Sequence, residues 1–168
     1  DANRIQFNFT YYAMKLLGKN LYSNPWTAIS ELVANGIDAK ARNIHVLVDM
    51  REKKHAVVEI IDDGDGMSRS DLEMKYTVIG RNKRESEENI EGKTLGRKGI
   101  GKLAALYLSP EYYIFTKNAV EESAWCINTL KYSDSDFPAL DMVDYDTAGL
   151  ISAEIWNKQK QGTMIHLS

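Results

Sequence analysis

The stretch ELVANGIDA, residues Glu31–Ala39, brings three polar side chains to one face of a predicted helix. Glu31, Asn35 and Asp38 are four and three residues apart, and side chains at these separations are neighbours on an α-helix. Apolar residues recur at helical spacing through 26–39, which predicts a helix over that range. The polar face interrupts a stripe that should be buried, so it is either a solvated surface or part of a functional site.

Two glycine-rich stretches follow this helix. DDGDGM carries Asp62, Gly64 and Gly66 as D-x-G-x-G at the end of a predicted strand, where an ordinary glycine turn is the alternative. GRKGIG, residues 96–101, leads into a predicted helix over 100–108. The free amides and the positive dipole end of a helix N-terminus suit a phosphate group.

The order of the predicted elements indicates an α+β fold. Further helices are predicted over 9–19 and 68–76, and strands over 44–50, 56–62, 112–116, 124–130 and 163–167. Strands that follow one another as hairpins argue against a doubly wound parallel sheet. We therefore expect a mixed, mostly antiparallel sheet with helices on one face.

Two stretches between these elements are polar. Residues 80–98 are charged and contain glycines, and a loop of this length tends to be functional. Residues 133–150 are acidic, and we expect them to be irregular and solvated.

The composition indicates one globular domain over residues 1–168, with 43% hydrophobic and 27% charged residues. The net charge of -3 gives no global signature of nucleic-acid binding.

A lone cysteine, Cys126, fits a reducing compartment, and no apolar run approaches the ~18 residues of a membrane span. We expect a cytoplasmic protein. The chain begins at Asp1 without Met, so we interpret it as a fragment of a longer protein.

Several familiar motifs are matched only in part. Residues 96–103 lack the Ser or Thr of a phosphate loop, because Leu103 stands there and cannot ligate Mg²⁺. GIGKLA fits a dinucleotide fingerprint, but the segment before it is too polar for the required buried strand. A calcium loop aligned on Gly66 would place Ile61 and Leu72 at ligand positions. Three histidines and one cysteine, all far apart, form no zinc pattern.

Together the polar helix face and the two glycine stretches resemble the GHKL ATPase superfamily, named for gyrase, heat-shock chaperones, histidine kinases and MutL. ELVANGIDA is similar to its N-box, DDGDGM to its D-x-G-x-G box and GRKGIGKLA to its third glycine box. QGTMIHL, with Gly162 and Thr163, resembles the fourth motif, and YTVIGRNKR resembles the stretch before the ATP lid. The resemblance implies a Bergerat-type fold, a two-layer α/β sandwich, and covers nearly the whole chain.

The resemblance also implies roles for individual residues. Asp62 would accept a hydrogen bond from the adenine amino group, assisted by Thr163, and Asn35 would ligate Mg²⁺ that bridges the phosphates. Residues 80 to about 101 would form a mobile lid. The full nucleotide-binding set implied is Asn35, Asp38, Asp62, Gly64, Gly66, Met67, Lys83, Gly96, Gly99, Ile100, Gly101, Lys102 and Thr163.

Glu31 distinguishes the branches of the superfamily. A carboxylate one helical turn before Asn35 can orient and deprotonate the attacking water, whereas the histidine kinases typically have Asn there. We therefore expect an ATPase of the chaperone-, MutL- or MORC-like branches, which dimerises on ATP in a longer protein with a transducer domain. A histidine-kinase-like domain and a non-hydrolysing nucleotide sensor remain alternatives. The client, DNA or protein, is open, and the isolated fragment is expected to hydrolyse ATP slowly or not at all.

Overall fold

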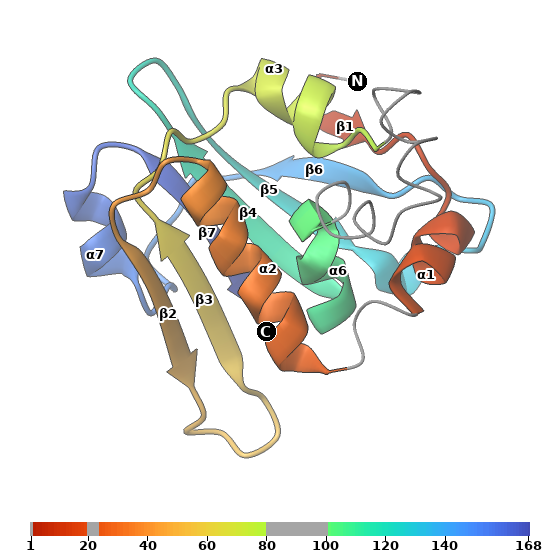
Figure 1. Cartoon of the computed structure of the whole chain (residues 1–168), viewed down its shortest axis with the longest axis horizontal. Coiled ribbons are helices and arrows are strands. Elements are labelled where there is room, and N and C mark those ends of the chain that lie inside the picture. The colour runs from red at the N-terminus through yellow and green to blue at the C-terminus, as the bar shows by residue number, and fades with distance from the viewer. Residues whose placement is uncertain (1, 20–23, 80–100) are drawn as a thin grey trace.

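The computed structural model of the chain describes residues 2–19, 24–79 and 101–168. Within these ranges seven strands form one sheet in the order β1-β6-β5-β4-β7-β3-β2, and every neighbouring pair is antiparallel (Figure 1). The strands are β1 (Arg4–Gln6), β2 (Ile44–Asp49), β3 (Val57–Asp62), β4 (Glu111–Lys117), β5 (Glu122–Asn128), β6 (Ala139–Val143) and β7 (Gly162–Leu167).

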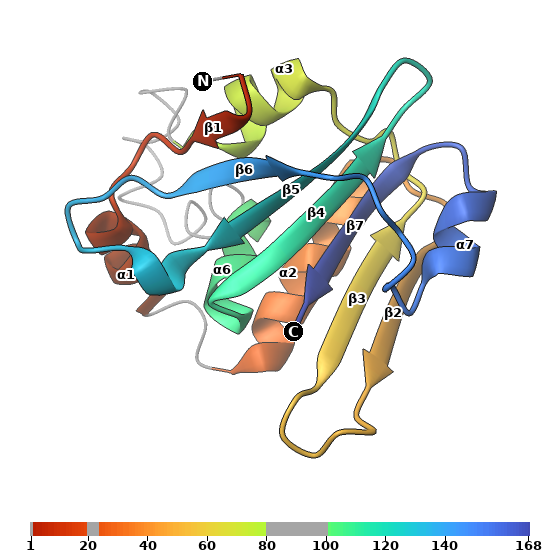
Figure 2. The same ribbon diagram turned by 180° about the vertical axis from the view of Figure 1, so that it is seen from behind.

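Most helices cover one face of this sheet, as the view from behind confirms (Figure 2). The described helical elements are α1 (Tyr11–Lys19), α2 (Pro25–Asp38), α3 (Arg69–Asp71), η1 (Leu72–Tyr76), η2 (Gly101–Leu103), α6 (Ala104–Leu108), η3 (Thr129–Lys131) and α7 (Ala153–Lys158). The short helix α7 differs, because its Trp156 packs with Ile61 and Met164 on the opposite face. The α+β class is as the sequence predicts, and the sheet, expected to be mixed and mostly antiparallel, is antiparallel in every described pair of strands.

Helix α2 begins and ends where its local sequence dictates. The side chain of Asn24 accepts a hydrogen bond from the Thr27 backbone N–H at 3.1 Å, and Pro25 occupies the first turn, where it needs no N–H partner. The helix ends at Asp38, and Lys40 takes a left-handed backbone with φ of 64°. Between these ends, α2 contacts β3 and buries Ala28, Leu32 and Gly36.

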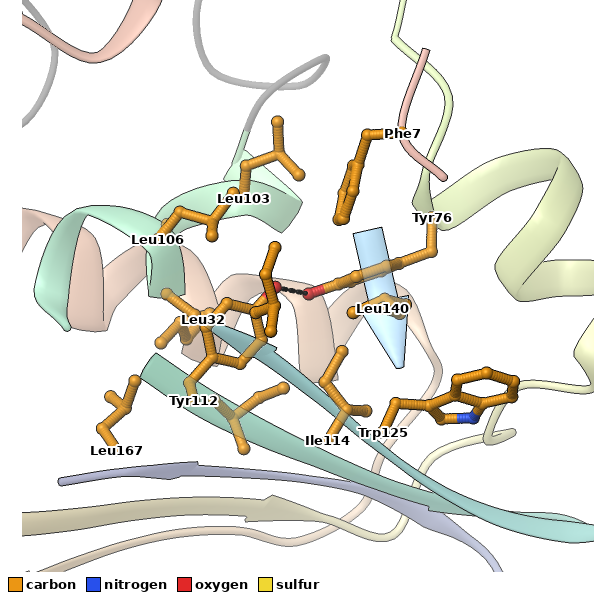
Figure 3. Packing of buried hydrophobic residues seen from close by; sticks show 14 of the residues in the cluster. Phe7, Leu32, Tyr76, Leu103, Leu106, Tyr112, Ile114, Trp125, Leu140 and Leu167 are labelled. Carbon is orange, nitrogen blue, oxygen red and sulfur yellow. Dashed lines mark hydrogen bonds between the residues drawn. The ribbon is translucent and has the colours of Figure 1, made fainter. Parts of the chain in front are cut away.

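The main core lies between the sheet and the helices α2 and α6. Figure 3 shows Leu103 and Leu106 above the strand residues Ile114 and Trp125, all of them buried. Tyr76 from η1 and Tyr112 from β4 meet through their hydroxyls at 3.0 Å inside this core. Burial raises the pKa of Tyr76 to about 12, so the pair stays neutral.

Two predictions about elements were wrong in detail, and two elements were missed. The acidic stretch 133–150 is not irregular throughout, since β6 lies within it and pairs with both β5 and β1. The single helix predicted over 100–108 is divided, within its described part, into the 3-10 turn η2 and the helix α6. The strand β1 and the helix α7 were not predicted. Within the described ranges, no helix has the length and apolar character needed to cross a membrane.

Candidate functional site

A pocket of about 410 Å³ opens between α2, the end of β3, β7 and the segment that contains α3 and η1. Seven of the predicted nucleotide-binding residues line it: Asn35, Asp38, Asp62, Gly66, Met67, Lys102 and Thr163. Four others, Lys83, Gly96, Gly99 and Ile100, lie outside the described residues. Motifs separated by more than 120 residues of sequence therefore meet in one cavity.

Asp62 occupies the deep end of this pocket. Its side chain is 8% exposed, and its Oδ1 accepts hydrogen bonds from the backbone N–H groups of Gly64 at 2.9 Å and Thr163 at 3.3 Å. Burial raises the pKa of Asp62, and the two N–H donors oppose that shift. Within the described part of the chain, every hydrogen bond to this carboxylate reaches Oδ1, so Oδ2 is open to a ligand donor.

The glycines after Asp62 are explained by close backbone contacts. Gly66 has φ of +69°, and a Cβ there would lie 2.1 Å from the carbonyl oxygen of Lys117. A Cβ at Gly64 would lie 2.7 Å from the carbonyl oxygen of Ala39. Gly64 does not itself line the pocket, but its amide holds Asp62 in place.

The other end of the pocket faces the start of η2. The Nδ2 of Asn35 lies 3.4 Å from the carbonyl oxygen of Gly101, and among the described residues the Oδ1 of Asn35 has no hydrogen-bond donor, so it can act as an acceptor. The half-buried Glu31 lies beside the same glycine, because a Cβ on Gly101 would be 2.6 Å from Glu31 Oε2. Glu31 and Asn35 therefore share the helix face predicted for them, although only Asn35 lines the pocket.

Lys102 reaches across the pocket to the segment on its far side. Its ammonium donates to the backbone carbonyls of Lys75 and Val78, at the end of η1. Burial lowers the pKa of Lys102 to about 8. An ammonium carries three protons, so one remains after these two contacts with the described part of the chain.

Sequence reasoning missed several residues of the site. Asp65, Asp71, Lys75 and Tyr76 also line the pocket, and they come from a turn and a short helical segment whose position depends on tertiary packing. The fully buried Thr116 lies behind the pocket and accepts a hydrogen bond from the Met67 backbone N–H at 2.8 Å. A single threonine near the end of a strand carries no sequence pattern that would single it out.

The donor set fits magnesium only if the ion is shared with a ligand. Among the described residues, no group of three or more His, Cys, Asp or Glu side chains could hold a metal. Mg²⁺, however, commonly keeps several waters and takes one or two protein oxygens together with substrate phosphates. The available Oδ1 of Asn35 in the pocket is an oxygen of the required kind.

Comparison with known proteins agrees with this geometry. The family model described as histidine kinase-, DNA gyrase B-, and HSP90-like ATPase matches residues 22–163. The DNA mismatch repair protein MutL of Clostridium botulinum (strain Eklund 17B / Type B) is 35% identical over 114 residues, which are 67% of this chain and 16% of that protein. MutL of Bacteroides fragilis is 36% identical over 111 residues, 66% of this chain and 17% of that protein.

A third relative has a different name. The putative type II restriction enzyme HgiDII of Herpetosiphon aurantiacus is 38% identical over 101 residues, 59% of this chain and 16% of that protein. The chain spans about one sixth of the length of the curated relatives it matches. The fold, the pocket and the matching family model together define the class: the chain belongs to the histidine kinase-, DNA gyrase B- and HSP90-like ATPase family. The resemblance to GHKL ATPases and to MutL is thereby confirmed.

Proposed function

We propose that this domain binds ATP with Mg²⁺ in the pocket and, within a longer protein, hydrolyses it to ADP. The observation that carries the proposal is Asp62, a buried carboxylate at the deep end of the pocket with Oδ1 satisfied by the protein and Oδ2 open. A carboxylate there accepts a hydrogen bond from the 6-amino group of adenine. It repels the 6-carbonyl of guanine, so the pocket selects an adenine base.

The phosphates would extend from Asp62 towards Asn35 and Lys102. Mg²⁺, held by Asn35 Oδ1, waters and phosphate oxygens, would supply charge neutralisation at the phosphates. The Lys102 ammonium would donate a hydrogen bond to a phosphate oxygen, while Asp38 would line the site near the ribose. These residues fix the position of the phosphate chain, which is most of what phosphoryl transfer requires from a protein.

Glu31 would act on the attacking water. We propose that its carboxylate orients a water molecule and accepts its proton as the water oxygen attacks the γ-phosphorus and the bond from the γ-phosphorus to the leaving ADP oxygen breaks. The position of Glu31 beside Gly101, one helical turn from Asn35, supports this role. The same carboxylate favours hydrolysis over transfer of phosphate to a histidine.

The remaining parts of the cycle are also proposals. Residues 80 to about 101, with Lys83, Gly96, Gly99 and Ile100, would form the lid and the phosphate contacts, and ATP would promote dimerisation of the longer protein. Relatives named for mismatch repair and for a restriction enzyme support a role for that protein in processing DNA.

The test compares two neighbouring aspartates by calorimetric titration with a non-hydrolysable ATP analogue and Mg²⁺. In Asp62→Asn the oxygen can still accept from Gly64 and Thr163, but an amide NH₂ replaces Oδ2 and faces the adenine amino group. We expect about 10- to 100-fold weaker binding, because a hydrogen bond to a charged group contributes about 1.5–3 kcal/mol.

Asp63→Asn is the matched control. The carboxylate of Asp63 accepts from the backbone N–H groups of Arg42 and Asn43 outside the pocket, so this variant should bind like the wild type. Equal affinities in Asp62→Asn and the wild type would refute the adenine site. Retained ATP binding in Glu31→Gln, together with lost turnover in the longer protein, would separate binding from hydrolysis.

A further inference from the structure

Thr116 lies directly behind the base end of the pocket, on β4. Its side chain is fully buried, and its Oγ1 makes three contacts: the Met67 N–H at 2.8 Å, the Thr163 Oγ1 at 3.1 Å and the Gly162 carbonyl oxygen at 3.2 Å. Thr163 is paired with Thr116 across β4 and β7, and with Asp62 across β7 and β3. Asp62, Thr163 and Thr116 thus form one row across the sheet, of which the first two line the pocket.

The single proton of the Thr116 hydroxyl determines whether the Thr163 hydroxyl can donate a hydrogen bond into the pocket. A hydroxyl has one proton to donate and two lone pairs. One lone pair of Thr116 is used by Met67, because an amide N–H can only donate. The proton of Thr116 then goes either to the Gly162 carbonyl or to Thr163 Oγ1.

Only the first arrangement satisfies all three contacts. If Thr116 donated to Thr163, its oxygen would face the Gly162 carbonyl oxygen at 3.2 Å with no proton between them. If Thr116 donates to Gly162, its second lone pair accepts the Thr163 proton, and every contact is a hydrogen bond. Thr163 is then left with lone pairs alone to present to the pocket.

We propose that Thr116 is a specificity-determining residue for the base, because it takes up the Thr163 proton and leaves the base edge of the pocket with acceptors only. This inference rests on the proposed function. The open Oδ2 of Asp62 and the lone pairs of Thr163 together match a base with an amino group at C6. A base with a carbonyl at C6, as in inosine triphosphate, finds no donor there and is rejected.

Thr116→Val tests the inference, since valine has the shape of threonine but no hydroxyl. The Thr163 proton is then free to turn into the pocket and to donate to a carbonyl. We expect the ratio of ATP affinity to ITP affinity to fall about tenfold in Thr116→Val, the effect of one hydrogen bond. Thr116→Ser, which keeps the hydroxyl, should hold the ratio within about twofold of the wild type. The measurement is competition of each nucleotide against a fluorescent ATP analogue, with thermal unfolding as a check of the fold.

A purely structural role for Thr116 predicts a different result. The loss of an acceptor for the Met67 N–H would weaken both nucleotides equally and leave the ratio unchanged, which would overturn the inference. A wild-type protein that binds ITP as tightly as ATP would also overturn it, without any variant. If Thr116→Val fails to fold, Thr116→Ala takes its place in the comparison, because it also lacks the hydroxyl.

The outcomes also separate this inference from the function on which it rests. A wild-type protein that binds no ATP refutes both. ATP binding that is lost in Asp62→Asn, together with an ATP to ITP ratio that Thr116→Val leaves unchanged, refutes the role of Thr116 alone.

Discussion

Gly101, in one motif, leaves room for the carboxylate of Glu31, which belongs to another motif. The glycine lies at the start of η2, and a Cβ there would come within 2.6 Å of Glu31 Oε2, the carboxylate that we propose as the proton acceptor. The next nearest atoms of Glu31 would be 3.5 and 3.9 Å away, so only the end of a flexible side chain obstructs a larger residue. The conflict is therefore with the position of Glu31 rather than with the fold.

We predict that Gly101→Ala reduces ATP hydrolysis by the longer protein about 10- to 100-fold, since a misplacement of about 1 Å has an effect of this size. The free energy of unfolding should change by less than about 1 kcal/mol, because Glu31 can turn aside. Steady-state ATPase assays and thermal unfolding measure the two effects. Gly149→Ala is the control, since a Cβ at Gly149 meets no atom within 4 Å. Full activity in Gly101→Ala would show that the position of Glu31 is not decisive.

At the scale of elements, one buried carboxylate on the sheet binds the two residues that precede α7. Glu59 on β3 is fully buried and accepts from the backbone N–H of Ser152 at 2.7 Å, from its hydroxyl at 2.6 Å and from the Ile151 N–H at 3.0 Å. The Nδ1 of His166 on β7 lies 2.8 Å from the same carboxylate. Burial is the largest single influence and raises the pKa of Glu59, but the hydrogen bonds from His166, Ser152 and Ile151 together outweigh it and leave the pKa below the ordinary value of 4.5.

Glu59→Gln should therefore destabilise the domain in a pH-dependent way. We expect the free energy of unfolding at pH 7 to fall by about 2 kcal/mol, the size of a hydrogen bond to a charged group. Because the pKa of Glu59 is lowered in the folded protein, this stabilisation is complete above pH 4.5. It is lost as the pH falls through the pKa that Glu59 has in the folded state. The difference between wild type and variant should thus shrink in acid.

Urea unfolding at pH 7 and below pH 4 measures this difference. The control is Glu154→Gln on α7, whose carboxylate is paired with Lys158 but 84% exposed, and which should change stability by under about 0.5 kcal/mol. An equal difference for Glu59→Gln at both pH values would mean that the charge of Glu59 does not contribute.

The elements that were predicted and those that were missed differ in what determines them. Helix α2 has a cap and an apolar stripe in its own sequence, and Ser68 forms the capping box expected of a helix start. β6 lies in a stretch in which aspartates interrupt the apolar residues. Its pairing with β1 joins residues more than 100 positions apart in the sequence, which a local pattern does not reveal. α7 is six residues long and is held by Glu59, a residue that resembles any other polar position in a strand.

The candidate site divides in the same way. Asp62, Gly66 and Thr163 were predicted because their spacing within motifs is specific, and they line one pocket. Thr116 and Tyr76 were missed because their roles depend on which strand or helix lies opposite. Motifs thus identify residues that line the pocket, and the structure is needed to find the residues that hold them in place.

At the scale of the whole molecule, the exposed side of α1 bears on the proposed ATP-dependent dimer. Tyr12, Leu16 and Leu17 are 51%, 53% and 42% exposed, whereas Met14 of the same helix is 3% exposed and packs in the core. An apolar face left at the surface of this helix is suited to contact with a second copy, as the proposed dimer requires.

We predict that Leu16→Glu prevents dimerisation of the longer protein with a non-hydrolysable ATP analogue while leaving nucleotide affinity within about threefold of the wild type. A charge on a half-exposed position should barely affect folding, but it would have to be buried and unpaired in the dimer. Light scattering of the longer protein with and without the analogue measures the mass.

Val120→Glu is the control, because Val120 is 91% exposed at the turn between β4 and β5. A wild type that stays monomeric with bound analogue would refute the dimer, whereas a Leu16→Glu protein that still doubles its mass would place the contact on another surface.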